Sequence, residues 1–214
     1  MPTVTAITPR RSTQSIVVEI DGELRFRLHE RRAPSIPPQG SLLHADEVEM
    51  LGDAQHADES ERRLLRLLER RGRSRQEVEE RLQTWGVVRH EASSIVDRLD
   101  VLGLMDDAAL AEAAADRAIA RGDGRGRLAA QLTSLRVDEP AAQGAQQRLA
   151  ESSELDRALA LIEQRFGPPP HDPATLRRAF ALLARRGYDE DVSRSALGVE
   201  ELPYLVCWRS RRWW

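Results

Sequence analysis

The sequence predicts a mainly α-helical protein in which three tandem three-helix repeats form an elongated body behind a small N-terminal β-hairpin segment. Near residue 21, alternating apolar residues flank an Asp-Gly pair, which is typical of a hairpin. Further along the chain, leucine, alanine and valine recur at spacings of three and four residues, as in amphipathic helices. This helical pattern returns at intervals of about 50 residues, which indicates tandem repeats.

Composition sets the bounds on domain number and location. The 214 residues suffice for one or two small domains, and a net charge of −3 argues against a polycation that binds nucleic acid through overall charge. All 32 basic residues are arginine, which fits either a GC-rich genome or a preference for bidentate phosphate contacts. The single cysteine, Cys207, has no partner for an internal disulfide. No signal peptide or membrane-length apolar run is evident, so we expect a cytoplasmic protein that does not contact membranes.

The N-terminal segment, residues 1–57, is expected to be β-rich and to end in a linker. A two-residue loop at Asp21-Gly22 would place Ile20 opposite Glu23, whereas a three-residue loop would place Ile20 opposite Leu24. Both registers remain open, and the earlier run TVTAIT offers a third strand. A turn or linker rich in proline and a short helical stretch at HADEVEMLGDA follow. The alternating apolar residues are Ile16, Val18, Ile20, Leu24, Phe26 and Leu28.

The three repeats are expected at residues 58–103, 104–150 and 151–198, with a Trp/Arg-rich tail at 199–214. In the second helix of the first repeat, Ser74 and Glu77 form a predicted capping box, and Gly86 is placed to end the helix. Each repeat should bury one equivalent leucine in its core. Arg136 replaces the helix-ending glycine in the second repeat, and the third has a longer connection at GPPPHDP. The equivalent apolar positions are Val78, Leu82 and Trp85, then Leu128, Leu132 and Leu135, then Ala179 and Leu183.

We expect no catalytic residue, cofactor or metal site. The five histidines are scattered singly, without the spacing that metal ligands need on a helix. Asp106 and Asp107 are the acidic pair that would best suit a metal site or acid–base catalysis. They directly precede an expected helix, however, and acidic residues at that place cap the first turn and complement the helix dipole. The glycine-rich run RGDGRGRL has neither a preceding strand nor the lysine of a phosphate-binding loop.

Clustered arginines are the candidate partner-binding residues. They occur at the turn between the first and second helices of the first two repeats, and on or beside the second helix of the third. The alternative is a solvated surface with ion pairs between neighbouring helix residues. The candidates are Arg70, Arg71, Arg73, Arg75, Arg121, Arg125, Arg127, Arg177, Arg178, Arg185 and Arg186.

The C-terminal tail combines three tryptophans with Arg209, Arg211 and Arg212. Such a mixture could stack on single-stranded bases. The alternative, which we favour, is a terminus outside the folded body.

The chain resembles the RecX regulatory proteins from about Thr3 to Gly198. Five stretches carry the resemblance together by their order and spacing: VVEIDGELRFRL, PPQGSLLHADEVEML, RRGRSRQEVEERLQTWGV, IVDRLDVLGLMDDAAL and FALLARRGYDEDV. The second repeat departs from the family in its alanine content and in Arg136, and the tail has no recognised counterpart.

The resemblance implies a curved stack of three-helix repeats that lies in the groove of the RecA recombinase filament on single-stranded DNA. Such a protein is not an enzyme and acts as a monomer. It would restrain filament growth, and with it the recombinase, ATPase and coprotease activities of RecA in DNA repair and the SOS response. The alternative is a tandem helical protein that binds DNA directly, which steep salt dependence without recombinase would reveal.

Overall fold

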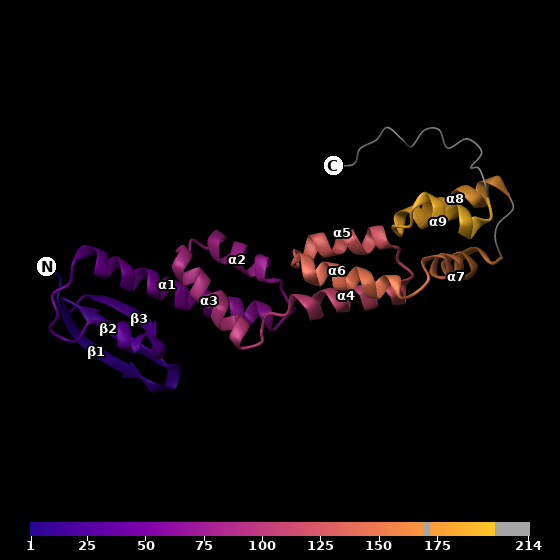
Figure 1. Cartoon of the computed structure of the whole chain (residues 1–214). Helices are drawn as coiled ribbons and strands as arrows, with labels where there is room; N and C mark the ends of the chain where they lie inside the picture. The colour runs from indigo at the N-terminus through magenta and orange to yellow at the C-terminus, as the bar shows by residue number, and fades with distance from the viewer. Residues whose placement is uncertain (169–171, 200–214) are drawn as a thin grey trace. The chain divides into compact units, whose positions relative to one another are not determined.

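The computed structural model describes residues 1–168 and 172–199, which separate into two units at the junction of Asp106 and Asp107 (Figure 1). The first unit contains a β-sheet and one group of three helices, and the second contains two further groups of three. Apart from Val199, the Trp/Arg-rich tail lies outside the described residues.

The N-terminal sheet has three antiparallel strands in the order β1-β2-β3. They are β1 (Val4–Arg10), β2 (Ser15–Ile20) and β3 (Leu24–His29), so the predicted third strand is present. Ile20 pairs with Leu24, so the loop has three residues and the second of the two open registers is confirmed. Asp21 and Gly22 adopt left-handed φ angles of 51° and 75°, a region that glycine enters without strain and aspartate tolerates.

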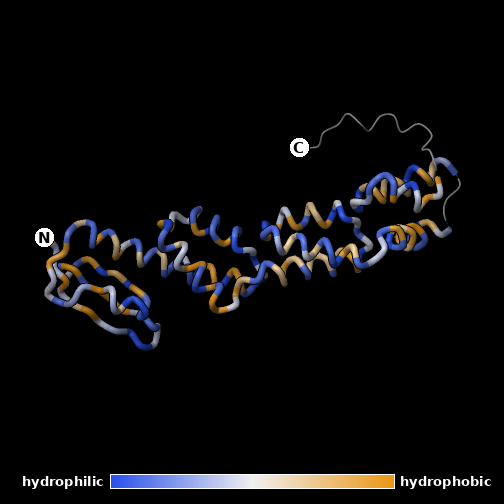
Figure 2. Tube along the Cα trace, viewed as in Figure 1, coloured by the Kyte–Doolittle hydropathy of each residue, from blue (hydrophilic) through white to orange (hydrophobic). Residues whose placement is uncertain are grey.

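One long helix, α1 (Ala45–Leu68), serves two hydrophobic cores. Its first half contributes Leu51 and Ala54 to the core under the sheet, and its second half contributes Ala57 and Leu64 to the core of the first repeat. Hydrophobic residues accordingly recur along the whole helix in Figure 2. The sequence predicted a short separate helical stretch before residue 58, and this was wrong, because two adjacent cores hold one continuous helix.

Two short 3-10 helices complete the N-terminal segment. The first, η1 (Arg11–Thr13), joins β1 to β2, and the second, η2 (Glu30–Ser35), follows β3. The predicted linker begins within η2, which places Arg31 and Arg32 against α1.

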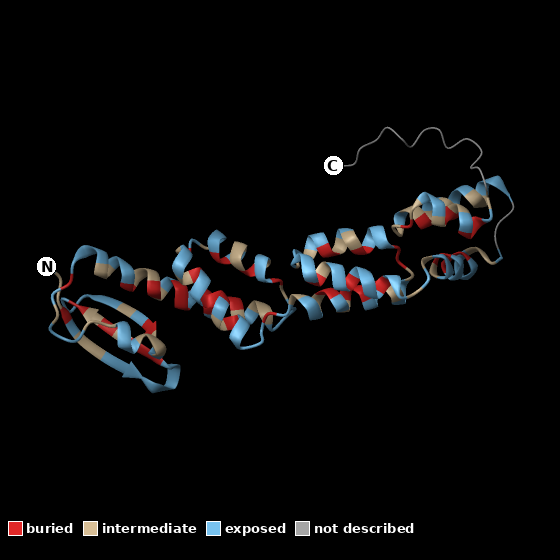
Figure 3. Ribbon diagram, viewed as in Figure 1, coloured by how far each residue is buried: buried red, intermediate tan, exposed pale blue. Residues whose placement is uncertain are grey.

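The helices form the three groups that the sequence predicted within the described residues. The first group is α1, α2 (Arg75–Thr84) and α3 (Arg89–Val101), and the second is α4 (Asp107–Arg121), α5 (Arg125–Leu135) and α6 (Glu139–Ala150). The third is α7 (Glu154–Phe166), α8 (Pro173–Arg185) and α9 (Glu190–Leu197). Buried residues lie on the inward sides of these helices (Figure 3).

The predicted core leucines are confirmed. Leu82, Leu132 and Leu183 are 0%, 3% and 0% exposed, and each belongs to the core of its own repeat. Burial of a leucine side chain of this kind stabilises a fold by about 1.5–3 kcal/mol.

The ends of the second helices follow the glycine pattern. After α2, the amide of Gly86 donates to Gln83 and the amide of Val87 donates to Leu82, the two bonds of a Schellman cap. Gly86 and Gly187 have φ angles of 80° and 82°, and Arg136 takes the equivalent left-handed conformation at 55°.

Candidate functional site

Glycines bring the second and third repeats into direct backbone contact. The amide of Gly124 donates to the carbonyl of Arg186 at 2.8 Å, and that of Gly126 to Gly187 at 3.0 Å. A Cβ atom on Gly124 would lie 2.6 Å from the Gly187 oxygen, and one on Gly187 would lie 2.2 Å from the Arg127 nitrogen. Side chains therefore cannot be accommodated there, and the glycine-rich run RGDGRGRL serves close packing, a role that the sequence alone did not suggest.

This contact brings arginines of the second and third predicted clusters together. Arg121 and Arg127 come from the end of α4 and the start of α5, and Arg185 and Arg186 from the end of α8. We call these four residues the seam arginines. With Ala120, Asp123, Gln164 and Leu182 they line a pocket of about 570 Å³.

One buried carboxylate serves the seam arginines. Asp123, with a side chain 3% exposed, accepts from Arg186 at 3.0 Å and lies 3.5 Å from Arg127. Arg121 and Arg185 are exposed, and no carboxylate among the described residues lies within ion-pair distance of either. Positive charge therefore exceeds negative charge in the pocket.

Backbone carbonyls orient two of these guanidinium groups. Arg186 donates to the carbonyl of Arg121 at 2.6 Å, and Arg127 donates to the carbonyl of Arg185 at 3.1 Å. These bonds hold the two side chains across the contact between the repeats while part of each guanidinium remains exposed.

The other arginines of these two clusters lie outside the pocket lining. Arg125 is paired with Asp189 at 2.5 Å. Arg177 and Arg178 are exposed on α8, where Arg178 donates to the hydroxyl of Thr175 at 2.8 Å.

The arginines of the first predicted cluster lie at the turn before α2, and most of them form ion pairs with acidic residues of the same chain. Arg71 donates twice to the Glu77 carboxylate, at 3.0 and 2.7 Å, and Arg73 donates to the same group. Arg75 pairs with Glu79, Asp97 and Asp100 at 3.3, 2.9 and 3.4 Å. Arg70 is exposed, and no carboxylate in the described part of the chain pairs with it.

Half of the predicted capping box is present. The Ser74 hydroxyl accepts from the Glu77 amide at 3.2 Å, as expected for an N-cap. The Glu77 side chain instead binds Arg71 and Arg73, because these arginines offer a charged partner.

The Asp106-Asp107 pair lies at the start of α4, as predicted. Asp107 occupies the first helical position, and its carboxylate accepts from the Asp138 amide at 3.0 Å. Since Asp138 is the N-cap of α6, Asp107 links the beginnings of two helices of the second repeat.

Within residues 1–168 and 172–199, no group of three or more His, Cys, Asp or Glu residues could hold a metal ion. His56 contacts the carbonyl of Trp85 at 2.8 Å, and His44 caps α1. His171 lies outside these ranges. No α-helix of the same residues combines the length and the apolar character needed to cross a membrane.

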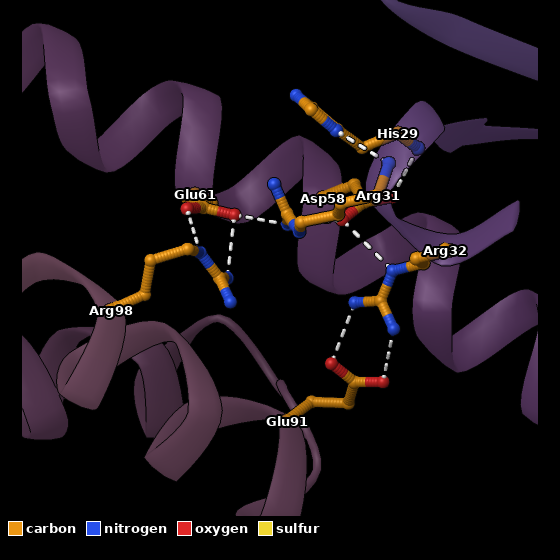
Figure 4. A network of polar contacts seen from close by, with 7 residues as sticks. All are labelled: His29, Arg31, Arg32, Asp58, Glu61, Glu91 and Arg98. Carbon is orange, nitrogen blue, oxygen red and sulfur yellow. Dashed lines mark hydrogen bonds and ion pairs between the residues drawn. The ribbon is translucent and has the colours of Figure 1, made fainter. Parts of the chain in front are cut away.

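Figure 4 shows a buried network of ion pairs in the first unit. The sequence contained no clear signal of this network. Asp58 on α1 accepts from the His29 amide at 2.7 Å, from Arg31 at 2.6 Å and from Arg32 at 3.0 Å. Its side chain is 2% exposed. Asp58 therefore ties the end of β3 and η2 to α1.

Two further carboxylates extend the network to α3. Arg32 donates to both oxygens of Glu91 at 2.7 and 2.6 Å, and Arg98 donates to both oxygens of Glu61 at 2.8 and 2.9 Å. Burial raises the pKa of Glu61, but the hydrogen bond from Arg98 and the charge of Arg31 outweigh it, so its pKa is lowered. The pKa of Glu91 is lowered likewise, because Arg32 outweighs burial. Three arginines meet three carboxylates, so this network is structural.

The fold defines a class: a repeat protein with an N-terminal sheet and tandem three-helix groups. Residues 62–99 match the family model described as RecX, first three-helix domain. The Regulatory protein RecX of Mycolicibacterium smegmatis is 33% identical over 143 residues, covering 64% of this chain and 76% of that protein. The Regulatory protein RecX of Xanthomonas campestris pv. campestris strain B100 is 36% identical over 135 residues, covering 63% and 83%.

Solved structures share the fold. A crystal structure of regulatory protein RecX superimposes with a TM-score of 0.70 at 15% identity, covering 92% of this chain and 99% of the other. RecX from Lactobacillus salivarius gives a TM-score of 0.55 at 18% identity, covering 68% and 96%. The chain belongs to the RecX family of regulatory proteins.

Proposed function

We propose that this chain binds the RecA recombinase filament on single-stranded DNA and inhibits its recombinase, ATPase and coprotease activities. The observation that carries the proposal is family membership, supported by similarity to RecX proteins over most of the chain. The chain acts as a cytoplasmic monomer and as a binder rather than an enzyme. It binds RecA through surface contacts and meets single-stranded DNA within the filament.

The arginine clusters are the proposed contact residues. Guanidinium groups form bidentate, charge-assisted bonds with phosphates and carboxylates, both of which a nucleoprotein filament offers. The seam arginines carry the strongest local excess of positive charge, whereas Arg71, Arg73 and Arg75 would have to exchange internal partners for those of the filament.

The test is the effect of this protein on preassembled RecA filaments on single-stranded DNA, followed by ATP hydrolysis and by filament disassembly. We expect ATP hydrolysis to fall and filaments to shorten as the protein is added. Unchanged hydrolysis and filament length with saturating protein would contradict the proposal.

Paired variants separate partner contact from folding. Replacing Arg70, Arg71 and Arg75 by Gln should weaken inhibition while the protein remains folded, because ion pairs of exposed arginines contribute only about 0–1 kcal/mol each. Replacing Asp106 and Asp107 by Ala should cost about 1 kcal/mol of stability and leave inhibition unchanged. A folded but inactive aspartate variant would assign the contact to Asp106 and Asp107 instead.

A further inference from the structure

We infer that the pocket between the second and third repeats is a phosphate-binding site that takes the phosphodiester backbone of single-stranded DNA. This inference deepens the proposed function, because the pocket gathers arginines from two of the proposed contact clusters. It adds a direct nucleic-acid contact that needs no recombinase.

The charge balance of the pocket is the first argument. Within the described part of the chain, the pocket lining contains Arg121, Arg127, Arg185 and Arg186 but one carboxylate, that of Asp123, which two of these arginines already share. Asp123 is buried, whereas Arg121 and Arg185 are exposed. An anion that enters the pocket from solvent would therefore meet the exposed arginines before the buried carboxylate.

Preorganisation is the second argument. Arg127 and Arg186 are held by backbone carbonyls of the opposite repeat, at 3.1 and 2.6 Å. These bonds rest on the glycine contact, where Gly124 and Gly187 fix the distance between the two backbones. Guanidinium groups held in advance lose less side-chain entropy when a phosphate binds.

The lining residues identify the part of the nucleic acid that is bound. Among the described residues, the pocket lining has no aromatic ring on which a base could stack, and its polar groups are mainly planar guanidinium donors. Guanidinium groups match phosphate oxygens in bidentate geometry, and phosphate contacts carry no sequence information. A volume of about 570 Å³ exceeds the space that one phosphate group needs, which leaves room for the adjoining sugars of a strand.

The experiment measures binding of a fluorescent oligo(dT) by anisotropy in the absence of recombinase. The test variant combines Arg121→Ala and Arg185→Ala, the two seam arginines without a carboxylate partner in the described structure. The matched control combines Arg117→Ala and Arg165→Ala, which removes the same charge from exposed positions of α4 and α7 outside the pocket lining and outside the proposed contact clusters. Thermal melting verifies that both variants fold.

We expect the pocket variant to bind oligo(dT) about tenfold or more weakly than the wild type, and the control to lose at most about threefold. The slope of log K against log salt should become shallower by about 1.4 in the pocket variant, since each phosphate contact on single strands contributes about 0.7. Oligo(dC) should give the same values as oligo(dT). Equal losses in the two variants, or an unchanged slope in the pocket variant, would overturn the inference.

A competition measurement identifies the source of the bound phosphate. The absence of recombinase from the assay keeps this inference separable from the proposed inhibition of RecA. Inorganic triphosphate at matched ionic strength should displace oligo(dT) poorly. Displacement as effective per phosphate as that by unlabelled oligo(dT) would make the pocket a free-phosphate site and overturn the backbone assignment. Because the assay contains no recombinase, its failure leaves filament inhibition by the wild type intact, and a lack of filament inhibition leaves this assay unaffected.

Discussion

The turn that leads into α2 and the turn that leads into α5 both carry clustered arginines, but their guanidinium groups have different surroundings. Before α2, Arg71 and Arg73 share Glu77, a partner four to six residues along the same chain segment. At the start of α5, Arg127 shares the buried Asp123 with Arg186, an arginine of another repeat. Before α2, a nearby carboxylate neutralises the arginines. At the start of α5, the docking of two repeats instead concentrates positive charge.

The comparison shows that clustering of arginines along a sequence does not determine the charge that a surface presents. The N-terminal unit uses arginine mainly to join elements, as the bidentate pairs of Arg32 with Glu91 and Arg98 with Glu61 demonstrate. The side chains of the seam arginines, by contrast, remain partly or largely exposed.

The largest expected effect is the loss of Glu61. We expect Glu61→Ala to lower the free energy of unfolding by about 3–5 kcal/mol, because Arg31 and Arg98 lose a shared carboxylate that is 8% exposed. Urea denaturation measures the change. Glu59→Ala, at an exposed position of the same helix, is the control and should stay within about 0.5 kcal/mol of the wild type. A loss below 1 kcal/mol for Glu61→Ala would mean that the network acts like a surface ion pair.

Acid should weaken the N-terminal unit through the same network. Glu61 and Glu91 have pKa values lowered in the folded state, so they bind protons more readily when unfolded. Their contribution is fully present above the unfolded pKa of about 4.3 and is lost as the pH falls through the folded pKa values. Urea denaturation between pH 7 and pH 3 should show this loss, and Glu61→Gln should reduce it. An identical pH dependence in Glu61→Gln would exclude Glu61 as a source.

A smaller effect is expected when the arginines before α2 lose the carboxylate that neutralises them. If Glu77 neutralises Arg71 and Arg73, Glu77→Gln should strengthen binding to oligo(dT) by about fivefold, equivalent to about 1 kcal/mol. Glu69→Gln makes the same change in net charge at an exposed site just before the turn, and it should have less effect. Equal gains in both variants would show that overall charge, rather than local pairing, sets the affinity.

The smallest expected effect concerns Arg136, which occupies a left-handed conformation where the first and third repeats have glycine. Arg136→Gly should raise the free energy of unfolding by about 0.5–1 kcal/mol, because glycine adopts this conformation without strain. The reverse change, Gly86→Arg, should cost a similar amount, since no atom lies within 4 Å of the added Cβ. Thermal melting of both variants checks the pair. Destabilisation by Arg136→Gly would show that the side-chain interactions of Arg136 outweigh its backbone strain.

Much of the fold follows from local patterns in the sequence. The periodic spacing around Leu82, Leu132 and Leu183 predicted three helical groups because burial on one helix face repeats every three or four residues. The two possible hairpin registers could not be separated, because the loop length depends on the left-handed conformation of Asp21 and Gly22. The continuity of α1 was missed because its two halves serve separate cores.

Less of the candidate site than of the fold could be predicted from the sequence. The arginine positions were visible, but their grouping into a pocket depends on the docking of α8 against the α4–α5 turn, about 60 residues apart in the chain. The ion network was missed for the same reason, since Arg32 and Glu91 are far apart in sequence. Charge pairing across such distances has no periodicity to detect.

The beginning of α5 has a consequence for how the second unit unfolds. Three consecutive amides, those of Gly124, Arg125 and Gly126, donate to acceptors of the third repeat, namely Arg186, Glu154 and Gly187. If the third repeat melted alone, α5 would lose the partners of its first turn, which a helix must find outside itself. The two repeats are therefore coupled, and the second and third repeats should melt together in a single cooperative transition rather than one after the other.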